Sequence, residues 1–544
     1  MGKRVSAFVA TLADTASRAQ CQDSYPKMDL IGSDALHRYM EKLIHGHHVP
    51  GVAIAVVHGR EIASMGFGKA SIDSAQNVTG DTLFSIGSLC KSLTAAAVAI
   101  MASDNERFPQ VQFDAVMSTL LPGEFVLSGD GHSNVTVGDV LSHQTGMPAH
   151  EFALLGSSAT EPDDAASVVR NLRNLPVSMP PRSQAIYCNS MYTAASHLVQ
   201  RMSNMAFSEY LGEKILRPLN MSSTFLESDH ARSKGQGGRM AVGYVRDAFT
   251  GRYQPVLSDS RPECLGAGMA ISSVNDFGRW IRALVNNERP LSADIVDQLT
   301  KSRIREYPED EADEGDEPST CYAYGWKVSD YCGSLMLSHG GNETGYSAHQ
   351  FFLPELKFGA VIFTNANRAD QFLSTVAYLL MDHVIYKPQQ DNLAEITASI
   401  DFESRLDGEH DSRTDDGMAE LESELRMELC PDAQSQENQL MRPSVYTGRY
   451  WNAGYKYIDI QDDNGELFMD CRDRSSAFTV TFAHVCGQTK YLAFVKETFD
   501  EPPFPVKAEF ILDNGRAVKM GIELEHKIEE YIWFERVEDS SSQY

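Results

Sequence analysis

The 544-residue sequence contains no apolar run that approaches the roughly 20 residues needed to cross a bilayer. Its first residues also lack the apolar core of a secretory signal, because Asp14 interrupts the little that is there. Basic side chains are in the minority, with 47 Lys and Arg against 75 Asp and Glu and a formal net charge of −28. So few cations are a poor basis for a groove that binds a phosphate backbone. We therefore expect no membrane span and no nucleic-acid partner.

Cysteine is present but follows no pattern. The nine Cys residues are an odd number, and no two of them form a Cys-x-x-Cys pair at metal-ligand spacing. In a chain of this length, that distribution predicts reduced thiols, a cytoplasmic location and no bound metal.

Several catalytic signatures are missing as well. The sequence has no Gly-rich phosphate-binding loop, no His-Glu-x-x-His and no Gly-x-Ser-x-Gly. Kinase, zinc metalloprotease and α/β-hydrolase functions therefore lack support, and no cofactor is predicted.

The composition, 42% hydrophobic and 22% charged, is that of a folded globular protein, but the chain is longer than one core usually holds. Changes in composition predict an N-terminal extension (1–29), a catalytic region (30–388), an acidic linker (389–441) with a helix at 418–427, and a C-terminal region (442–544). An acidic insertion at 309–317 is expected to be a mobile surface loop.

Strand patterns at both ends of the catalytic region predict its fold class. Residues 51–57 and 61–67 suggest one hairpin, and residues 347–352 and 359–363 suggest another, with amphipathic helices between the two. This arrangement predicts an α+β fold in which helices pack on an antiparallel sheet assembled from distant segments.

The C-terminal region alternates short strands with turns. Asn464-Gly465 and Asn514-Gly515 supply the positive φ angles of tight hairpins. Six to eight such strands in about 100 residues predict an all-β domain, a small barrel or sandwich.

The strongest candidate for chemistry is a serine at the start of a predicted helix. Ser88 follows Gly87, and Lys91 lies three residues further on, where a helix places both side chains on one face. Leu89, Leu93, Ala96, Ala97 and Ile100 form an apolar stripe along that helix. A buried lysine gives up its proton more readily and can then act as a base toward the serine hydroxyl.

The spacing Ser-x-x-Lys is weak by itself. Ser24 and Lys27 repeat it in a polar, proline-containing segment with no predicted helix. On spacing alone, Ser88 is better explained as a helix-capping serine than as a nucleophile.

Two later motifs, in order, change this interpretation. Tyr187-Cys-Asn189 leads into a second predicted helix, and His339-Gly-Gly341-Asn342 enters the late strand pair. The ordered set resembles the serine β-lactamase and penicillin-binding-protein superfamily. It is most similar to the branch that holds class C β-lactamases, D-aminopeptidases, D-alanyl-D-alanine carboxypeptidases and related esterases. The likeness spans about residues 30–385.

The resemblance implies a role for each motif residue. Ser88 would attack a carbonyl and become acylated, while Lys91 and Tyr187 share the proton transfers. Asn189 would hold Lys91 or a substrate amide oxygen. The backbone N–H groups of Ser88 and of Asn342, which follows Gly341, would form the oxyanion hole.

His339 stands where β-lactamases have a lysine that binds the substrate carboxylate. A histidine is only partly charged at neutral pH, which favours neutral esters, amides or thioesters over penicillins. His339 is nevertheless assigned to substrate binding.

Three functions remain open. The first is a serine hydrolase acting on a small-molecule acyl substrate through acyl-Ser88. The second is an acyltransferase that passes the acyl group to an alcohol or amine, an activity that the superfamily includes. The third is an inactive binding protein. By resemblance, the C-terminal domain would lean over the active site and narrow substrate choice. The alternative is a module that stabilises the protein or lets it dimerise, and a dimerising module would make the protein a homo-oligomer.

Overall fold

The computed structural model describes residues 32–247, 250–306, 320–386, 415–431, 438–498 and 502–538. The predicted N-terminal extension, the acidic insertion at 309–317 and the second Ser-x-x-Lys copy lie outside these ranges.

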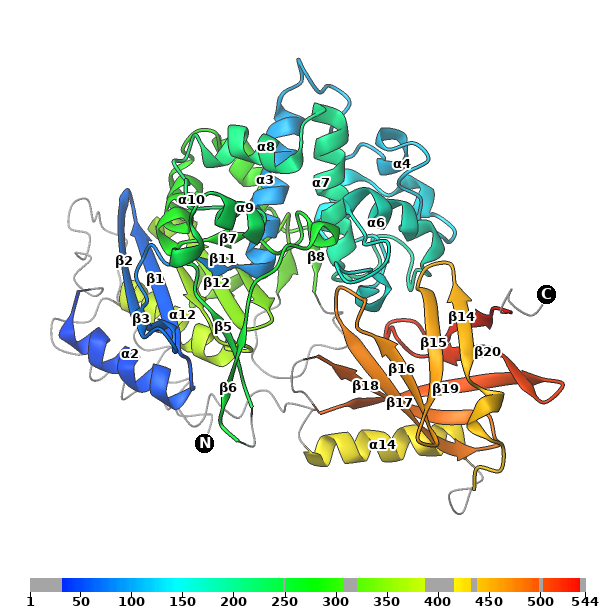
Figure 1. Ribbon diagram of the computed structural model, residues 1–544. Coiled ribbons are helices and arrows are strands. Elements are labelled where there is room, and N and C mark those ends of the chain that lie inside the picture. The colour runs from blue at the N-terminus through cyan, green and yellow to red at the C-terminus, as the bar shows by residue number, and fades with distance from the viewer. Residues whose placement is uncertain are drawn as a thin grey trace, which may run out of the picture.

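Two bodies make up the described chain (Figure 1). The larger one, blue to yellow-green, combines a sheet with helices, and the smaller one, orange to red, is a β-barrel with one helix across its base. The prediction of an α+β domain followed by an all-β domain is confirmed.

The sheet of the larger domain is antiparallel and joins the two ends of that domain. Within the described residues its strand order is β3-β2-β1-β13-β12-β11-β10-β9-β8. In sequence order these strands are β1 (Gly51–His58), β2 (Glu61–Ser71), β3 (Gln76–Asn77), β8 (Ile304–Arg305), β9 (Cys321–Tyr322), β10 (Lys327–Tyr331), β11 (Ser334–Glu343), β12 (Tyr346–Leu353) and β13 (Phe358–Thr364). Both predicted hairpins are present, and β1 pairs with β13 so that Val52 lies opposite Thr364.

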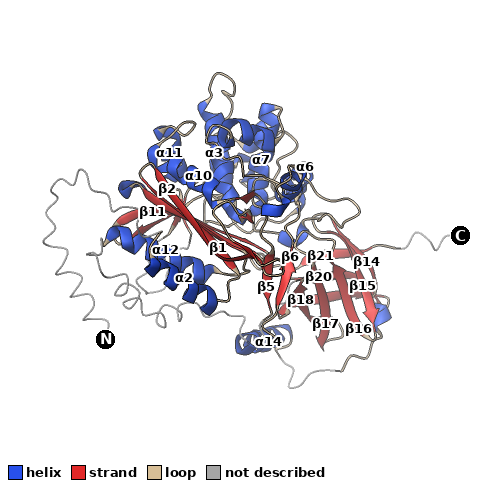
Figure 2. Ribbon diagram, turned by 60° about the vertical axis from the view of Figure 1, so that its left-hand side comes forward, coloured by secondary structure: helices blue, strands red, loops and turns tan. Residues whose placement is uncertain are grey.

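Helices cover both faces of the sheet (Figure 2). On one face α2 and α12 pack on alternate residues of β1 such as Val52 and Ile54. On the other face α3, α7 and α10 pack with the opposite residues, such as Ala53 and Ala55. The helices are α2 (Asp34–Gly46), α3 (Cys90–Ser103), α4 (Met117–Leu120), α5 (Val137–Leu141), α6 (Ala165–Asn171), α7 (Asn189–Ser203), α8 (Phe207–Leu211), α9 (Ser228–Ser233), α10 (Val274–Asn286), α11 (Ala293–Thr300) and α12 (Asp370–Ile385). Side chains that alternate across β1 thus serve two separate cores.

Two short strand pairs complete the larger domain. They are β4 (Phe84–Ser85) with β7 (Ile271–Ser272), and β5 (Gly243–Arg246) with β6 (Tyr253–Val256). The first pair ends three residues before Ser88, so it fixes where the chain enters the candidate site.

The smaller domain is a closed barrel of strands β14 to β21. They are β14 (Gly448–Asn452), β15 (Lys456–Asp463), β16 (Glu466–Cys471), β17 (Phe478–Cys486), β18 (Lys490–Glu497), β19 (Phe504–Asp513), β20 (Arg516–Ile522) and β21 (Ile532–Arg536). Asn464 and Asn514 have φ angles of 56° and 50° in their hairpin turns, as the Asn-Gly pairs predict. Closure leaves the sheet without a free edge.

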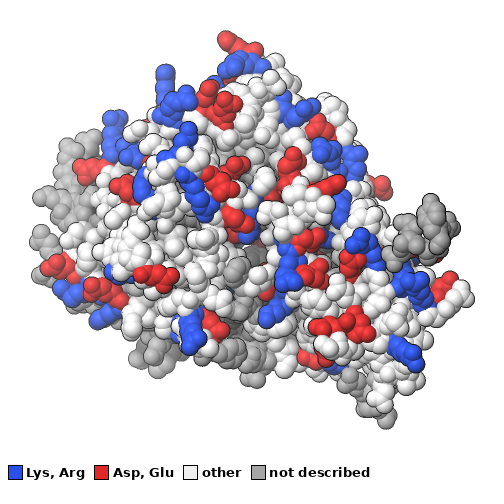
Figure 3. All heavy atoms as spheres, viewed as in Figure 1, with Lys and Arg blue, Asp and Glu red and all other residues white. Residues whose placement is uncertain are grey.

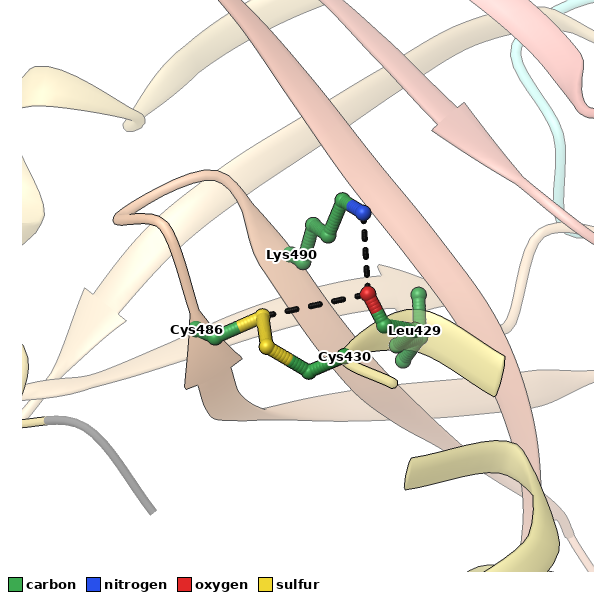
Figure 4. The surroundings of a disulfide bond; sticks show 4 residues. All are labelled: Leu429, Cys430, Cys486 and Lys490. Atoms are coloured by element: carbon green, nitrogen blue, oxygen red, sulfur yellow. Dashed lines mark hydrogen bonds between the residues drawn. A yellow bond between two sulfur atoms is a disulfide. The ribbon is translucent and has the colours of Figure 1, made fainter. Parts of the chain in front are cut away.

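Helix α14 (Asp415–Leu429) packs against β18 and β19 at the base of the barrel. A disulfide joins Cys430, just after this helix, to Cys486 at the end of β17, and Lys490 Nζ donates to Leu429 O at 2.8 Å (Figure 4). The prediction of reduced thiols is therefore wrong for this pair. The two cysteines are 56 residues apart, and only the docking of α14 brings them together.

Among the described residues, no helix combines the length and apolarity that crossing a bilayer requires. In the same part of the chain, no three His, Cys, Asp or Glu side chains are grouped to hold a metal ion. On the face drawn in Figure 3, basic and acidic side chains are interspersed, without a continuous basic stripe.

Candidate active site

Ser88 lies in a tight turn that leads into α3. Residues Gly87–Leu89 form a 3-10 turn, and the α-helix begins at Cys90, two residues later than predicted. Gly87 has a φ angle of +48°, and a Cβ there would lie 2.8 Å from the backbone N of Asn342. Glycine is therefore required for the turn to lie against the strand that carries Asn342.

Helix α3 is buried on nearly every side, beyond the single apolar stripe predicted from the sequence. It lies between the sheet and the helices above it, so its polar residues find partners inside. The hydroxyl of Ser92 donates to Leu89 O at 2.8 Å, and that of Thr94 donates to Gly266 O at 2.7 Å. Lys91 is likewise fully buried.

Lys91 points at Ser88, as the i,i+3 spacing predicts. Its Nζ lies 3.0 Å from Ser88 Oγ, 2.6 Å from Asn189 Oδ1 and 2.7 Å from Ala267 O. All three partners can accept, so they satisfy the three protons of the ammonium form. The amine is thus held at one place and in contact with the nucleophile. Ala267 was not predicted, because the contribution of a backbone carbonyl leaves no signal in the sequence.

Tyr187 completes the contacts of the serine. Its hydroxyl lies 2.8 Å from Ser88 Oγ, and Lys91 Nζ lies 4.8 Å from the centroid of its ring. The side chain is 40% exposed, so it stands at the border between the buried lysine and solvent. Behind it the ring of His143 lies at 4.3 Å, and Nδ1 of that histidine accepts from the Cys188 N–H. Both groups that could move the serine proton therefore reach Oγ directly.

Asn189, the first residue of α7, holds Lys91 rather than pointing free into solvent. Its Oδ1 accepts from Lys91, and its Nδ2 donates to Glu151 Oε1 at 2.8 Å. Burial raises the pKa of the Glu151 carboxyl, and the charge of Lys91 acts in the opposite direction. Sequence reasoning did not find Glu151, since it begins a short 3-10 turn (Glu151–Ala153) that lies 38 residues before Asn189 and carries no motif.

Of the two predicted oxyanion donors, Asn342 lies on β11, beside the 3-10 turn that carries Ser88. Pairing with β10 ends at Ser338, which leaves the following part of β11 open on that edge. A Cβ on Gly341 would lie 2.2 Å from Ile86 O and 3.1 Å from Ser88 N. The strand can approach the turn this closely only because residue 341 is a glycine. The structure thus brings Ser88 and Asn342 together, and Asn342 Nδ2 donates to Asp370 Oδ1 at 3.0 Å.

His339 is buried and neutral, which corrects the expectation of a partial charge. Its Nε2 accepts from Tyr322 Oη at 2.8 Å, and its Nδ1 donates to Gly340 O at 2.6 Å. Burial, together with the charge of Lys91, lowers its pKa to about 3. The side chain is 3% exposed and packs behind Tyr187, at a ring distance of 6.4 Å.

We expect this histidine to make the protein sensitive to acid. Unfolded histidine takes up a proton below about pH 6.5, whereas His339 stays neutral down to about pH 3. In that window the unfolded state binds more protons, so the free energy of unfolding falls as the pH falls. In denaturant titrations between about pH 7 and 4.5, His339→Gln should show a shallower loss of stability than the wild type. The exposed His230→Gln is the control, and equal slopes for all three proteins would contradict the prediction.

A cavity of about 1220 Å³ opens beside Ser88. Its lining includes Ser88, Asn189, Glu151 and Asn342 from the larger domain. The barrel also contributes, through the residues Arg472, Arg474, Ser475, Ser476, Ala477, Glu497 and Thr498. The C-terminal domain therefore forms a wall of the same cavity that Ser88 faces.

Backbone hydrogen bonds fasten the barrel to the loop beneath that wall. Gly156 N donates to Asp473 O, and Ser475 N donates to Leu154 O, both at 2.9 Å. These bonds flank an isolated bridge between Leu155 and Arg474. The barrel loop thus extends the larger domain as a short strand would, and the two domains share one site.

The chain is similar to known protein families and to a named relative. A family model described as Beta-lactamase matches residues 36–384, and one described as a domain of unknown function (DUF3471) matches residues 436–536. The chain is 31% identical over 502 residues to the unguisins hydrolase ungD' of Aspergillus campestris, covering 91% of this chain and 90% of that protein.

Two solved structures share the fold. The octameric penicillin-binding protein homologue from Pyrococcus abyssi superposes with a TM-score of 0.56 at 18% identity, covering 92% of this chain and 99% of that chain. The class C β-lactamase from Rhodobacter sphaeroides superposes with a TM-score of 0.50 at 21% identity, covering 65% of this chain and 100% of that chain. With the family model matching more than half of its length, the chain belongs to the serine β-lactamase and penicillin-binding-protein superfamily.

Proposed function

We propose that the protein is a serine hydrolase that cleaves an ester, amide or thioester through an acyl-Ser88 intermediate. The observation that carries the proposal is that Ser88 Oγ lies within hydrogen-bonding distance of two proton carriers, Lys91 Nζ at 3.0 Å and Tyr187 Oη at 2.8 Å. A serine is a weak nucleophile until a neighbouring base takes its proton.

The reaction would proceed in two halves. Lys91 as the neutral amine, or Tyr187 as the phenolate, removes the Ser88 proton while Oγ forms a bond to the substrate carbonyl carbon. The bond to the leaving group then breaks, and that group takes the proton. Water next attacks the acyl ester, which releases the acid and restores the Ser88 hydroxyl.

The negative charge that develops on the carbonyl oxygen needs donors in place. The backbone N–H groups of Ser88 and Asn342 are the candidates, since Gly87 and Gly341 let the Ser88 turn lie directly against β11. A preorganised donor of this kind contributes roughly 10²- to 10³-fold to kcat in other acyl-transfer enzymes.

Two features bear on the substrate. The cavity of about 1220 Å³ exceeds the range of about 300 to 1,000 Å³ typical of small-ligand pockets, and the barrel forms part of it. His339 stays neutral and offers no fixed charge for a β-lactam carboxylate. A larger substrate without that carboxylate fits both features. The Aspergillus relative is named as a hydrolase of unguisins, so unguisins are the first compounds to assay.

The test is to trap the acyl-enzyme. Wild-type protein incubated with an unguisin, and separately with a fluorophosphonate, should gain one adduct that peptide mass spectrometry assigns to Ser88. Substrate should be consumed, with a hydrolysed product appearing. Ser88→Ala should show neither adduct nor product.

Two outcomes would replace the proposal. If added alcohols or amines receive the acyl group faster than water does, the protein is an acyltransferase that uses the same intermediate. If the wild type takes no label from the fluorophosphonate and consumes no substrate, the chain is a binding protein with an inactive site.

A further inference from the structure

The turn that carries Glu151 is held by the barrel on both sides of that residue. Before it, the His150 N–H donates to Glu525 Oε2 at 2.8 Å. After it, the ring of Phe152 packs on that of Phe478 at 4.4 Å. Glu525 and Phe478 both belong to the barrel domain and are 4% and 1% exposed. The barrel therefore contacts the residues that flank a carboxylate of the candidate site.

His150 fixes the conformation of the turn that carries Glu151. Its φ angle of +48° is uncommon for a residue other than glycine and persists only where the surroundings fix it. Pro176 O at 2.8 Å can only accept, so Nε2 carries the proton and Nδ1 accepts from Tyr455 Oη at 2.7 Å. Burial lowers the pKa of this histidine and keeps it neutral, which preserves the arrangement. Tyr455 of the barrel thus fixes the ring of His150, and the backbone of His150 turns the chain toward the site.

From Glu151 the contacts lead directly to the proposed base. Glu151 Oε1 accepts from Asn189 Nδ2, and this leaves Asn189 Oδ1 to accept from Lys91 Nζ. An amide can rotate end for end, and Glu151 favours one of the two orientations because a carboxylate oxygen accepts from the NH₂ group. The result is a continuous series of contacts from Tyr455 and Glu525 in the barrel to the amine beside Ser88.

We propose that Glu151 is a positioning residue, held in place by the barrel, that fixes the Asn189 amide and through it Lys91. The inference deepens the proposed hydrolase function and rests on it. The C-terminal domain then contributes to the rate of acylation itself, in addition to forming a wall of the cavity. A misplacement of the base by about 1 Å is enough to lower a rate by about 100-fold.

Three variants test the site side of this series. Glu151→Ala should lower kcat by about 30- to 100-fold, with KM changed by less than about threefold, because the amine is displaced while the cavity remains. Glu151→Gln should recover kcat to within about fivefold of the wild type, since its amide oxygen can accept from Asn189 Nδ2. Asp276→Asn changes a buried carboxylate that is not among the residues lining the cavity, so it is the control for stability and should leave kcat unchanged.

The barrel side is tested by a double-mutant cycle. Tyr455→Phe should lower kcat in the same direction as Glu151→Ala, and it should have little further effect in the Glu151→Ala background. Tyr446→Phe removes the hydroxyl of an equally buried barrel tyrosine, which donates to Gln488 O and takes no part in the series of contacts described above. It should leave kcat unchanged even if the melting temperature falls.

The outcomes separate this inference from the proposed function. Suppose that fluorophosphonate labels Ser88 in the wild type. If Glu151→Ala is also labelled and hydrolyses substrate at the wild-type rate, the positioning role is wrong and the proposed hydrolase function stands. A Gln variant no more active than the Ala variant, an effect confined to KM, or additive effects of Tyr455 and Glu151 would also overturn it. If wild-type Ser88 takes no label at all, the proposed function fails first.

Discussion

Replacing Ser88 by alanine is expected to lower kcat by at least about 10⁴-fold and to leave the fold intact. Lys91 and Tyr187 both form a hydrogen bond with this hydroxyl, so its removal leaves a base without a nucleophile. Loss of the nucleophile in a serine hydrolase costs roughly 10⁶-fold in kcat, and the residual rate comes from binding and the oxyanion donors. Initial rates on the same substrate, with thermal unfolding as a check on folding, measure the effect.

The second Ser-x-x-Lys copy provides the control for this experiment. Ser24 and Lys27 share the spacing but lie outside the described residues. Ser24→Ala should keep activity within about twofold of the wild type. A large loss of activity in Ser24→Ala, or retention of activity in Ser88→Ala, would show that the nucleophile has been misassigned.

The next largest effect is expected for Lys91→Met, with kcat lower by about 10³- to 10⁴-fold. Methionine is close to lysine in length and apolar, so it fills the buried space without a base. The protein should still fold, since removing a buried charge offsets the loss of donors to Asn189 Oδ1 and Ala267 O. General-base assistance alone contributes about 10²- to 10⁴-fold, and the lost contact to Ser88 adds misalignment.

Lysine's role as a base, rather than as a structural cation, is tested by the arginine variant. Lys91→Arg keeps the charge and the donors but cannot lose a proton in the working pH range. It should be as inactive as Lys91→Met in substrate turnover. Activity near the wild-type level in Lys91→Arg would mean that the amine acts only through its charge, and Tyr187 would then be left as the base.

Short-range patterns in the sequence were enough for the architecture. The segments 51–57 and 359–363 are apolar throughout, which is a local property typical of strands that are buried on both faces of a sheet. The Asn-Gly pairs at 464–465 and 514–515 mark hairpins because their φ angles demand those residues. The start of α3 was shifted by two residues because the chain first makes a 3-10 turn against β11, a long-range contact.

The candidate site also combines contacts that short-range sequence patterns predict with contacts that only the folded chain produces. The contacts of Ser88 with Lys91 arise from helical spacing, and the order of the later motifs indicated which distant residues would join them. Glu151 carried no such signal: its importance comes from a hydrogen bond to a residue 38 positions later and from a barrel more than 300 residues away. The pairing of Cys430 with Cys486 was missed for a similar reason, since it depends on where α14 docks.

The sequence by itself determined the fold class, the closed or sandwiched nature of the last domain, and the residue types that can carry acyl-transfer chemistry. These properties depend on periodicity, turn chemistry and spacing, which act over a few residues. Only the tertiary structure decided the neutral state of His339, the hold of the barrel on Glu151 and the shape of the shared cavity. Desolvation and hydrogen bonding across domains depend on which distant surfaces exclude water from one another, and no local stretch of sequence specifies that.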